Sequence, residues 1–321
     1  MKITIKENSF KLTQPFTISR GSRSHAHVLS VEIEDEGMVG WGECVPYERY
    51  GETLESVSET IKGVNQPFDR ETLQDAVAPG AARNALDCAL WDLESKKYNT
   101  PVWQLAGLNS LQPLITAVTI SLGTPEAMYQ DALANKDRPL LKVKLGGKGD
   151  IPRIEAIHQA APNSKLIVDA NESCQENDFP DLIAKLLELD VAMVEQPFPA
   201  DQDHFLMDYK SPIPICADES CHDCNSLDDL VGKYDMINIK LDKTGGLTEA
   251  LKLLAKGKEM GFDIMVGCMV GSSLAMAPAM LVAQHASIVD LDGPLFLVED
   301  RKHGLAFKRS MVFPPESMLW G

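Results

Sequence analysis

The sequence is poor in positive charge. Its 321 residues contain 30 lysines and arginines against 47 aspartates and glutamates, a formal net charge of −17. A nucleic-acid backbone and an anionic membrane surface would both be repelled by such a protein, so neither is expected as a partner. Charge of this kind favours solubility and carries no information about the fold.

The sequence also lacks a disulfide framework and a targeting segment. Seven cysteines are an odd number without regular spacing, which favours a reduced, cytoplasmic location. The spacing of Cys221 and Cys224 matches half of a zinc site, but no second Cys-x-x-Cys exists. The N-terminus alternates like a β-strand and has no apolar run of the kind that a signal peptide needs.

One long stretch has no charge at all. Residues 264–283 are long enough to span a membrane as a helix. However, Gly267, Gly271 and Pro278 interrupt the stretch, and no aromatic residues flank it. We therefore expect a buried strand followed by a buried helix.

From about residue 114, short apolar runs rich in β-formers alternate with helical stretches. Continuous apolar runs indicate strands that are buried on both faces, as in parallel sheets. Eight strands that alternate with helices predict a closed (β/α) barrel, with a doubly wound sheet as the alternative. The runs are 114–120, 140–145, 165–171, 191–196, 214–219, 236–241, 263–269 and 287–292.

The first 105 residues have a different pattern. Alternating apolar residues near positions 3–5 and 28–33 predict a small antiparallel sheet, and 80–98 predicts a strong helix with one apolar face. The predicted fold class is thus α/β, in three parts. An α+β domain spans 1–110, a barrel spans 111–300, and a C-terminal segment, 301–321, packs back on the first domain.

Ionisable residues end most of the predicted strands. Active sites of (β/α) barrels lie at the C-terminal ends of the strands. Residues i and i+2 of a strand share a face, so two pairs of charges each point to one place. Taken singly, such residues are more often helix caps or solvated loop residues, but together they predict a site. They are Lys142, Lys144, Asp169, Glu195, Asp218, Lys240, Asp290 and Asp292.

The three acids Asp169, Glu195 and Asp218 follow successive strands. Bare carboxylates cannot lie side by side in a protein interior without a cation, and an all-oxygen set favours Mg²⁺. Lys144 and Lys240 are four strands apart and should face each other across the barrel mouth. This arrangement suits removal and return of a proton next to a carboxylate, through an enolate whose charge the metal stabilises.

The motifs that contain these residues resemble the enolase superfamily, specifically its muconate-lactonizing subgroup. The resemblance covers nearly the whole chain and implies a capping domain over a (β/α)7β barrel, a Mg²⁺ ion and enolate chemistry. The matching segments are the helix 82–93, Lys142-Val143-Lys144, Val168-Asp169-Ala170-Asn171, Val194-Glu195-Gln196-Pro197, Ala217-Asp218-Glu219-Ser220 and the stretch from Ile239 to Gly246.

Within that subgroup, Asp290-Leu291-Asp292 is similar to the Asp-x-Asp of dipeptide epimerases. The resemblance implies that these two acids hold the α-ammonium of the substrate. Three relatives act on acids without a free amino group, and the two aspartates argue against each of them. They are N-acylamino acid racemase, o-succinylbenzoate synthase and muconate cycloisomerase.

The loop 19–25 is expected to bind the rest of the substrate. In family members specific for L-Ala-L-Glu an arginine of this loop takes the glutamyl side chain, and Arg23 matches best, with Arg20 second. A guanidinium can hold a carboxylate through two hydrogen bonds. Ser272 follows the seventh run, where its hydroxyl either binds the reacting carboxylate or simply caps a helix. The loop 47–52 should close beside these groups.

The resemblance therefore predicts a Mg²⁺-dependent dipeptide epimerase, with L-Ala-D/L-Glu as the expected substrate and murein peptide recycling as its implied role. Lys144 and Lys240 would be the acid/base pair, and Lys142 would neutralise the substrate carboxylate. Two alternatives outside the family are an enzyme that forms a lysine Schiff base with pyridoxal phosphate and a binding protein stabilised by Ca²⁺. The sequence leaves the oligomeric state open, a homo-oligomer included.

Overall fold

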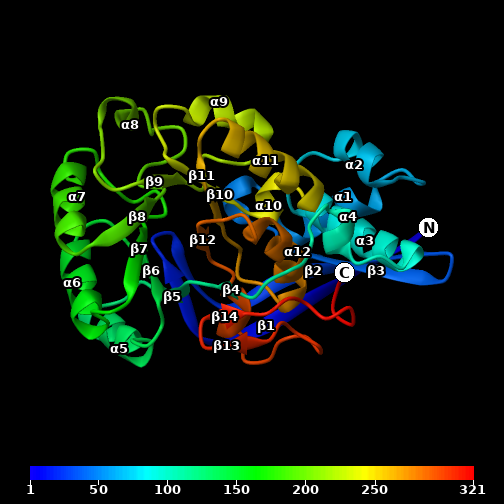
Figure 1. The fold of residues 1–321 in the computed structure, drawn as a ribbon, viewed down its shortest axis with the longest axis horizontal. Coiled ribbons are helices and arrows are strands. Elements are labelled where there is room, and N and C mark those ends of the chain that lie inside the picture. The colour runs from blue at the N-terminus through cyan, green and yellow to red at the C-terminus, as the bar shows by residue number, and fades with distance from the viewer.

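The computed structural model describes all residues from Met1 to Gly321. Figure 1 shows a mixed domain that carries both chain ends, beside a larger body of parallel strands and helices. No helix is long and apolar enough to cross a membrane. The uncharged stretch at 264–283 instead forms a strand, Asp263–Val266, and a helix, Ser273–Ala283, as expected.

The N-terminal part is built on a three-stranded antiparallel sheet of β1 (Lys2–Ile18), β2 (Gly21–Asp35) and β3 (Met38–Cys44). The alternation seen in the sequence thus forms the predicted sheet, although β1 and β2 make a longer hairpin than the apolar residues alone indicated. Helices cover one face of this sheet: α1 (Leu54–Lys62), α2 (Arg70–Ala76), α3 (Ala81–Tyr98) and the short α4 (Val102–Leu105), after a 3₁₀ turn at Glu48–Tyr50.

Helix α3 is buried on both sides, whereas the sequence predicted one apolar face. Leu86 and Leu90 pack into the core beneath the antiparallel sheet, while Cys88 and Trp91 pack into the core of the barrel. The helix therefore lies between the two parts of the molecule and joins them. Its two-sided burial needs small residues on the sheet side, and β3 supplies Gly40 and Gly42 there.

The eight predicted runs form one parallel sheet whose strands follow chain order. Its strands are β5 (Val118–Ile120), β6 (Leu140–Lys144), β7 (Lys165–Asp169), β8 (Val191–Glu195), β9 (Ile215–Ala217), β10 (Met236–Ile239), β11 (Asp263–Val266) and β12 (Ile288–Val289). The first run is divided, because Leu114–Ile115 (β4) leaves the barrel and pairs with the C-terminal hairpin of β13 (Phe307–Lys308) and β14 (Met311–Val312).

The sheet curls until its two edge strands meet. The N–H of Ala117 donates to the Val289 carbonyl at 2.8 Å, and the N–H of Leu291 donates to Thr116 Oγ1 at 2.8 Å. A third bond runs from the N–H of Thr119 to Asp292 Oδ2 at 2.7 Å. These contacts close the barrel with one backbone bond and two side-chain bonds, which brings the ends of the first and last strands together.

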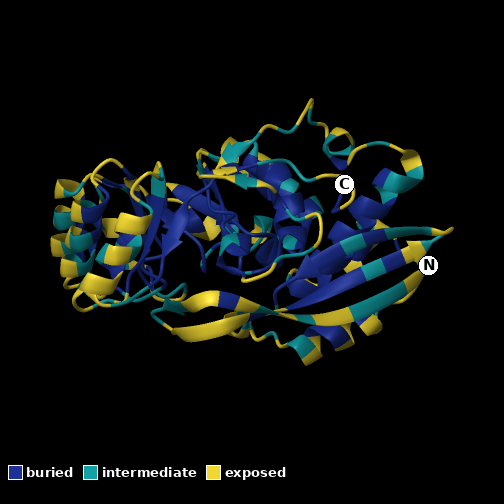
Figure 2. Cartoon of the chain, turned by 90° about the horizontal axis from the view of Figure 1, so that it is seen from below, coloured by how far each residue is buried: buried dark blue, intermediate teal, exposed yellow.

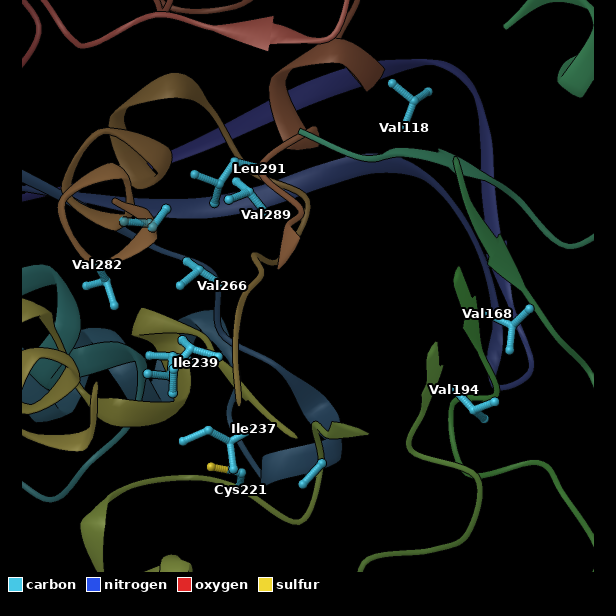
Figure 3. Close-up of a cluster of buried hydrophobic side chains, with 14 of the residues drawn as sticks. Val118, Val168, Val194, Cys221, Ile237, Ile239, Val266, Val282, Val289 and Leu291 are labelled. Atoms are coloured by element: carbon cyan, nitrogen blue, oxygen red, sulfur yellow. The ribbon is translucent and has the colours of Figure 1, made fainter. Parts of the chain in front are cut away.

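Helices cover the outside of the barrel, with their outer faces exposed and the strands buried (Figure 2). Valine and isoleucine side chains of the strands point outward into the layer between sheet and helices (Figure 3). The covering helices are α5 (Pro125–Ala134), α6 (Asp150–Ala160), α7 (Phe179–Glu188), α8 (Phe205–Asp208), α9 (Leu227–Leu230), α10 (Leu241–Thr244), α11 (Leu247–Glu259) and α12 (Ser273–Ala283), with 3₁₀ turns at Cys224–Ser226 and Gly293–Phe296.

The C-terminal residues contact helix α3. Trp320 is 1% exposed and its Nε1 donates to the Cys88 carbonyl at 3.0 Å. The N–H of Gly321 donates to Asp92 Oδ1 at 2.8 Å. Met1 also ends near this helix, because its amino group pairs with Asp35, which in turn pairs with Lys97.

Candidate active site

Strand alternation builds the inside of the barrel in two layers. Inward side chains at the lower strand positions form a small apolar cluster that includes Ile167, Met193 and Met265. Two residues further along most of these strands the inward positions become polar or charged. Ile167 is thus followed by Asp169 and Met193 by Glu195. The charged layer lies at the C-terminal strand ends, where barrels of this type carry their sites.

Lys142 lies at the centre of this charged layer. Its Nζ lies 2.7 Å from Glu195 Oε2, 2.8 Å from Asp290 Oδ2 and 3.2 Å from Asp169 Oδ2. Burial favours the neutral amine, but the three carboxylates outweigh burial and raise the pKa of Lys142 above its ordinary value. Lys142 is therefore a permanent positive charge among buried acids.

The two predicted acid/base lysines each contact one predicted metal ligand. Lys144 Nζ lies 2.6 Å from Asp169 Oδ2, and Lys240 Nζ lies 2.5 Å from Asp218 Oδ2. Both lysines are 7% exposed, and their strands are four apart in the sheet order. Burial lowers the pKa of Lys240, but Asp218 and Glu195 outweigh burial and raise it. Two ammonium groups thus approach the barrel mouth from separate strands.

The three acids predicted to bind a metal are neighbours. Asp169 and Glu195 are register partners on β7 and β8, and Asp218 directly follows β9. Their ammonium partners separate them, and no three acidic, histidine or cysteine side chains have the geometry of a metal site. The electrostatics nevertheless fit a cation. Burial and Asp169 raise the pKa of Glu195 to about 7, with Lys142 opposing them. Burial would also raise the pKa of Asp169 and of Asp218, but their lysine partners outweigh it and lower both. Glu195 is therefore the acid that would gain most from an added cation. Oxygen ligands of this kind suit Mg²⁺.

Asp290 and Asp292 follow the last strand and are both 4% exposed. Asp290 Oδ2 is held by Lys142, whereas its buried Oδ1 has no hydrogen-bond partner. Asp292 Oδ2 accepts the N–H of Thr119, and burial together with Asp290 raises the pKa of Asp292 to about 7. The pair therefore has spare acceptor capacity and would gain from a further cation.

The two loop arginines have different surroundings. Arg20 is already engaged: one NH group lies 2.7 Å from Glu219 Oε1 and another lies 3.0 Å from Glu172 Oε2. Arg23 forms no ion pair, and its guanidinium lies over the ring of Tyr47, 5.5 Å from the ring centroid. Of the two, only Arg23 has a guanidinium free to take a ligand carboxylate.

The structure does not bring Ser272 to this site. Its Oγ donates to Glu43 Oε2 at 2.5 Å and accepts from Arg301 Nε at 2.7 Å, and its N–H donates to Glu43 Oε1 at 2.8 Å. Ser272 is the N-cap of α12 and accepts from the N–H of Leu274. The hydroxyl is therefore committed to a buried contact between β3, α12 and the C-terminal segment.

A cavity of about 900 Å³ lies over the charged layer. Lys144, Asp218 and Lys240 line its barrel side, and Arg23 and Tyr47 line its capping side. The other predicted site residues are buried and do not line the cavity; besides Ser272, they are Lys142, Asp169, Glu195, Asp290 and Asp292.

Two buried polar side chains of the site were missed by sequence reasoning. Lys243 is 1% exposed, and its Nζ lies 2.6 Å from Asp218 Oδ1 and 3.0 Å from the Asn238 carbonyl. Asn238 donates from Nδ2 to Glu195 Oε1 at 2.7 Å. The signal for Asn238 was present, since it lies two residues before Lys240 and shares its face.

Glu172 holds two capping segments at the barrel mouth. It follows β7 with φ +67° and pairs with Arg20 from the β1–β2 turn and with Arg49 from the loop after β3. Arg49 makes two bonds to it, of 2.8 and 2.7 Å. The Ser19 hydroxyl and Arg20 also donate to the neighbouring Asn171 carbonyl. These contacts fix the two loops over the cavity.

Two family models match the chain. Residues 1–107 match the mandelate racemase / muconate lactonizing enzyme N-terminal domain, and residues 126–311 match the enolase C-terminal domain-like family.

Two relatives are similar to the chain over almost their whole length. An N-acetyl-D-glutamate racemase from Pseudoalteromonas sp. is 48% identical over 92% of this chain and 95% of its own length. An L-Ala-D/L-Glu epimerase from Escherichia coli K12 is 45% identical over 95% of this chain and 97% of its own. The names of both relatives refer to a glutamate residue or derivative.

Solved structures have the same fold. An enolase family member from Agrobacterium tumefaciens with homology to dipeptide epimerases, with bound sodium and L-Ala-L-Glu, is 46% identical and has a TM-score of 0.98 over 99% of both chains. A dipeptide epimerase from Enterococcus faecalis complexed with Mg and L-Leu-L-Tyr is 30% identical, with a TM-score of 0.91 over 98% of this chain and 97% of its own.

Proposed function

The chain belongs to the mandelate racemase / muconate lactonizing enzyme branch of the enolase superfamily, and from that premise we propose that it epimerises dipeptides, with L-Ala-D/L-Glu as the preferred substrate. The observation that carries the proposal is the pair Asp290 and Asp292, two buried acids with spare acceptor capacity. They lie in the charged layer beneath the cavity that Lys144 and Lys240 line.

Lys144 and Lys240 would exchange the α-proton of the second residue. They come from strands four apart, so one can approach each face of a substrate held between them. One lysine must be neutral to remove the proton, and the other must be charged to return one. Asp169 and Asp218 orient the two side chains.

Asp169, Glu195 and Asp218 would hold Mg²⁺. When bound, Mg²⁺ would supply positive charge to the substrate carboxylate as negative charge develops next to it. Lys142, buried beside Glu195, adds a second, fixed positive charge next to the substrate carboxylate. Asp290 and Asp292 would bind the α-ammonium of the first residue. Arg23, which lines the cavity over the Tyr47 ring and forms no ion pair, would bind the glutamyl carboxylate.

All seven cysteines are free, as a reducing compartment requires. We therefore place the enzyme in the cytoplasm, where it would act in the recycling of murein peptides.

Racemisation of N-acylglutamate is the second candidate, since the relative from Pseudoalteromonas carries that name and is 48% identical. The two functions differ at the amino group of the substrate. A free ammonium needs ionised Asp290 and Asp292, whereas an acylated nitrogen offers no positive charge to them. The unpartnered Oδ1 of Asp290 favours the ammonium.

Proton exchange in D₂O tests both candidates in one experiment. The protein with Mg²⁺ is incubated separately with L-Ala-L-Glu and with N-acetyl-L-glutamate, and the glutamyl α-proton is followed by NMR. We expect the signal of the dipeptide to disappear while its diastereomer appears. Exchange confined to N-acetylglutamate would replace the proposal with racemisation, and exchange in neither would overturn both.

A further inference from the structure

The cavity is larger than the proposed substrate needs. Its volume of about 900 Å³ lies near the upper end of sites that hold drug-sized ligands, about 300–1,000 Å³. A dipeptide of alanine and glutamate is smaller than such a ligand. The cavity therefore has room for a group beyond the second residue.

The spare room is bounded by a basic stripe on β2. Arg23, His25 and His27 alternate along this strand and all three line the cavity. The two imidazole rings are stacked with centroids 6.1 Å apart, which places them on one side of the strand.

None of the three forms an ion pair, whereas Arg20 and Arg49, which also line the cavity, are paired with Glu172. The ring of His25 is hydrogen-bonded to an uncharged group, Ser24 Oγ, at 3.1 Å. In a protein with a net charge of −17, a row of unpaired nitrogen donors beside the active-site lysines favours an anionic ligand group.

The chemistry of the site restricts where that group can be attached. Proton removal next to a carboxylate requires the α-carboxylate of the reacting glutamate to stay free. The α-ammonium must also stay free, because Asp290 and Asp292 bind it in the proposed complex. A third residue can therefore be joined only through the side-chain carboxyl. A strand advances about 3.3 Å per residue, so His25 lies about 7 Å beyond Arg23, within reach of one added residue.

We propose that the cavity accepts a tripeptide in which a third residue is linked to the glutamyl side chain, and that His25 and His27 bind the carboxylate of this third residue. The inference rests on the proposed function and extends its substrate class from dipeptides to acidic, γ-linked peptides. In such a complex Arg23 contacts the γ-linked amide oxygen, and the stripe continues to the terminal carboxylate.

Two substrates that differ by one carboxymethyl group test this inference. L-Ala-L-Gln carries an uncharged amide at the side chain, and L-Ala-γ-L-Glu-Gly carries the same amide extended by a carboxylate. We expect kcat/KM for α-proton exchange to be at least about threefold higher for the tripeptide, because its added carboxylate accepts hydrogen bonds from the ring nitrogens. Equal values for the two substrates would overturn the inference.

The double variant H25A/H27A identifies the residues responsible, because it removes both ring donors. It should bring the ratio of the two kcat/KM values to about one, whereas the control H204A/H285A, which removes two histidines that do not line the cavity, should keep the wild-type ratio. A ratio that survives in H25A/H27A would refute the assignment to β2. Exchange of L-Ala-L-Glu by the wild type is measured alongside. If the dipeptide exchanges but the tripeptide shows no advantage, only the proposed subsite is wrong. If the dipeptide does not exchange, the proposed function is wrong, and this inference is wrong with it.

Discussion

Each proposed acid/base lysine is held by a carboxylate of its neighbouring strand. Lys144 contacts Asp169 and Lys240 contacts Asp218, so the two sides of the barrel mouth repeat one motif. Each pair is buried, and both lysines line the cavity. This symmetry suits a reaction in which either epimer can be the substrate.

We predict that Lys144→Ala and Lys240→Ala each abolish epimerisation and leave the fold intact. Because the remaining lysine still faces one side of the α-carbon, each variant should exchange the α-proton of one diastereomer with solvent and convert neither. NMR in D₂O, started from each pure diastereomer, measures exchange and conversion separately. If either variant retained near-full conversion, the two-base mechanism would be wrong.

Asp292 has a hydrogen bond that an amide can keep. Its Oδ2 accepts the N–H of Thr119, so Asp292→Asn removes the charge and preserves the strand contact. Loss of a charged partner for the ammonium should raise KM for L-Ala-L-Glu by about 10- to 100-fold. Calorimetric titration should show Mg²⁺ affinity changed by less than about threefold. An equal loss of both affinities would place Asp292 in the metal site.

At the scale of elements, the contact of α3 with β3 determines how closely the capping sheet lies to the barrel. A Cβ on Gly42 would lie 2.1 Å from the Ala85 carbonyl oxygen, and one on Gly40 would lie 2.1 Å from that of Ala89. The helix and strand backbones are therefore in direct contact, and the alanines of the helix complete the fit.

We expect Gly42→Ala to destabilise the protein by about 3 kcal/mol, because two backbones must separate to admit the methyl group. Gly63→Ala is the control: at this helix end φ is −80° and the nearest atom to the new Cβ is 3.4 Å away, so the change should stay within about 1 kcal/mol. Urea denaturation gives both values. Similar stabilities for the two variants would show that α3 and β3 can shift apart freely.

Periodicity explains why so much of the barrel could be predicted from the sequence. Outward valines and isoleucines alternate with inward residues, and the inward position turns ionisable at most strand ends, as at Asp169 and Glu195. This regularity is local, so a single sequence displays it. Helix α3 was only half predicted, because its second apolar face is recognised only once a second core lies against it.

Contacts between distant segments could not be predicted in this way. Ser272 was expected either to bind the reacting carboxylate or to cap a helix. The structure confirms the helix cap, at α12, and the other partners of Ser272 are Glu43 and Arg301, each remote from it in the chain. Likewise, nothing near Arg20 in the sequence indicated that Glu172 and Glu219 would engage it and leave Arg23 free. The partners of these side chains depend on how the capping part packs against the barrel.

At the scale of the whole molecule, Asp242 joins the barrel to the capping part. Its Oδ1 accepts the N–H of Val45 at 3.0 Å and the Nδ2 group of Asn84 at 2.8 Å. Burial raises the pKa of Asp242 to about 7, against the two hydrogen bonds. The folded protein therefore holds a proton here at pH values where the unfolded chain has lost it, so the free energy of unfolding falls as the pH rises from about 4 to about 7.

Asp242→Asn keeps the acceptor oxygen and removes the charge. We expect the variant to match the wild type near pH 4 and to gain on it as the pH rises toward 8, by up to about 4 kcal/mol for a pKa difference of about three units. Urea denaturation at several pH values measures the difference, in which the other titrating groups cancel. Parallel curves across this range would show that Asp242 is ionised in the folded protein.

The ion pairs of Glu172 with Arg20 and Arg49 hold the capping loops over the barrel, so that substrate binding and proton transfer are carried by different parts of the protein. The lysines and acids of the chemistry belong to barrel strands, whereas Arg23, His25, Tyr47 and Arg49 belong to loops and strands of the capping part, attached over the cavity by a few ion pairs. Mutations in the capping loops can therefore change which molecule is held while the proton-transfer groups stay in place. Proteins with this architecture can therefore acquire new substrates through a few substitutions in the capping loops. The names of two relatives, one for an N-acetylated amino acid and one for a dipeptide, agree with this.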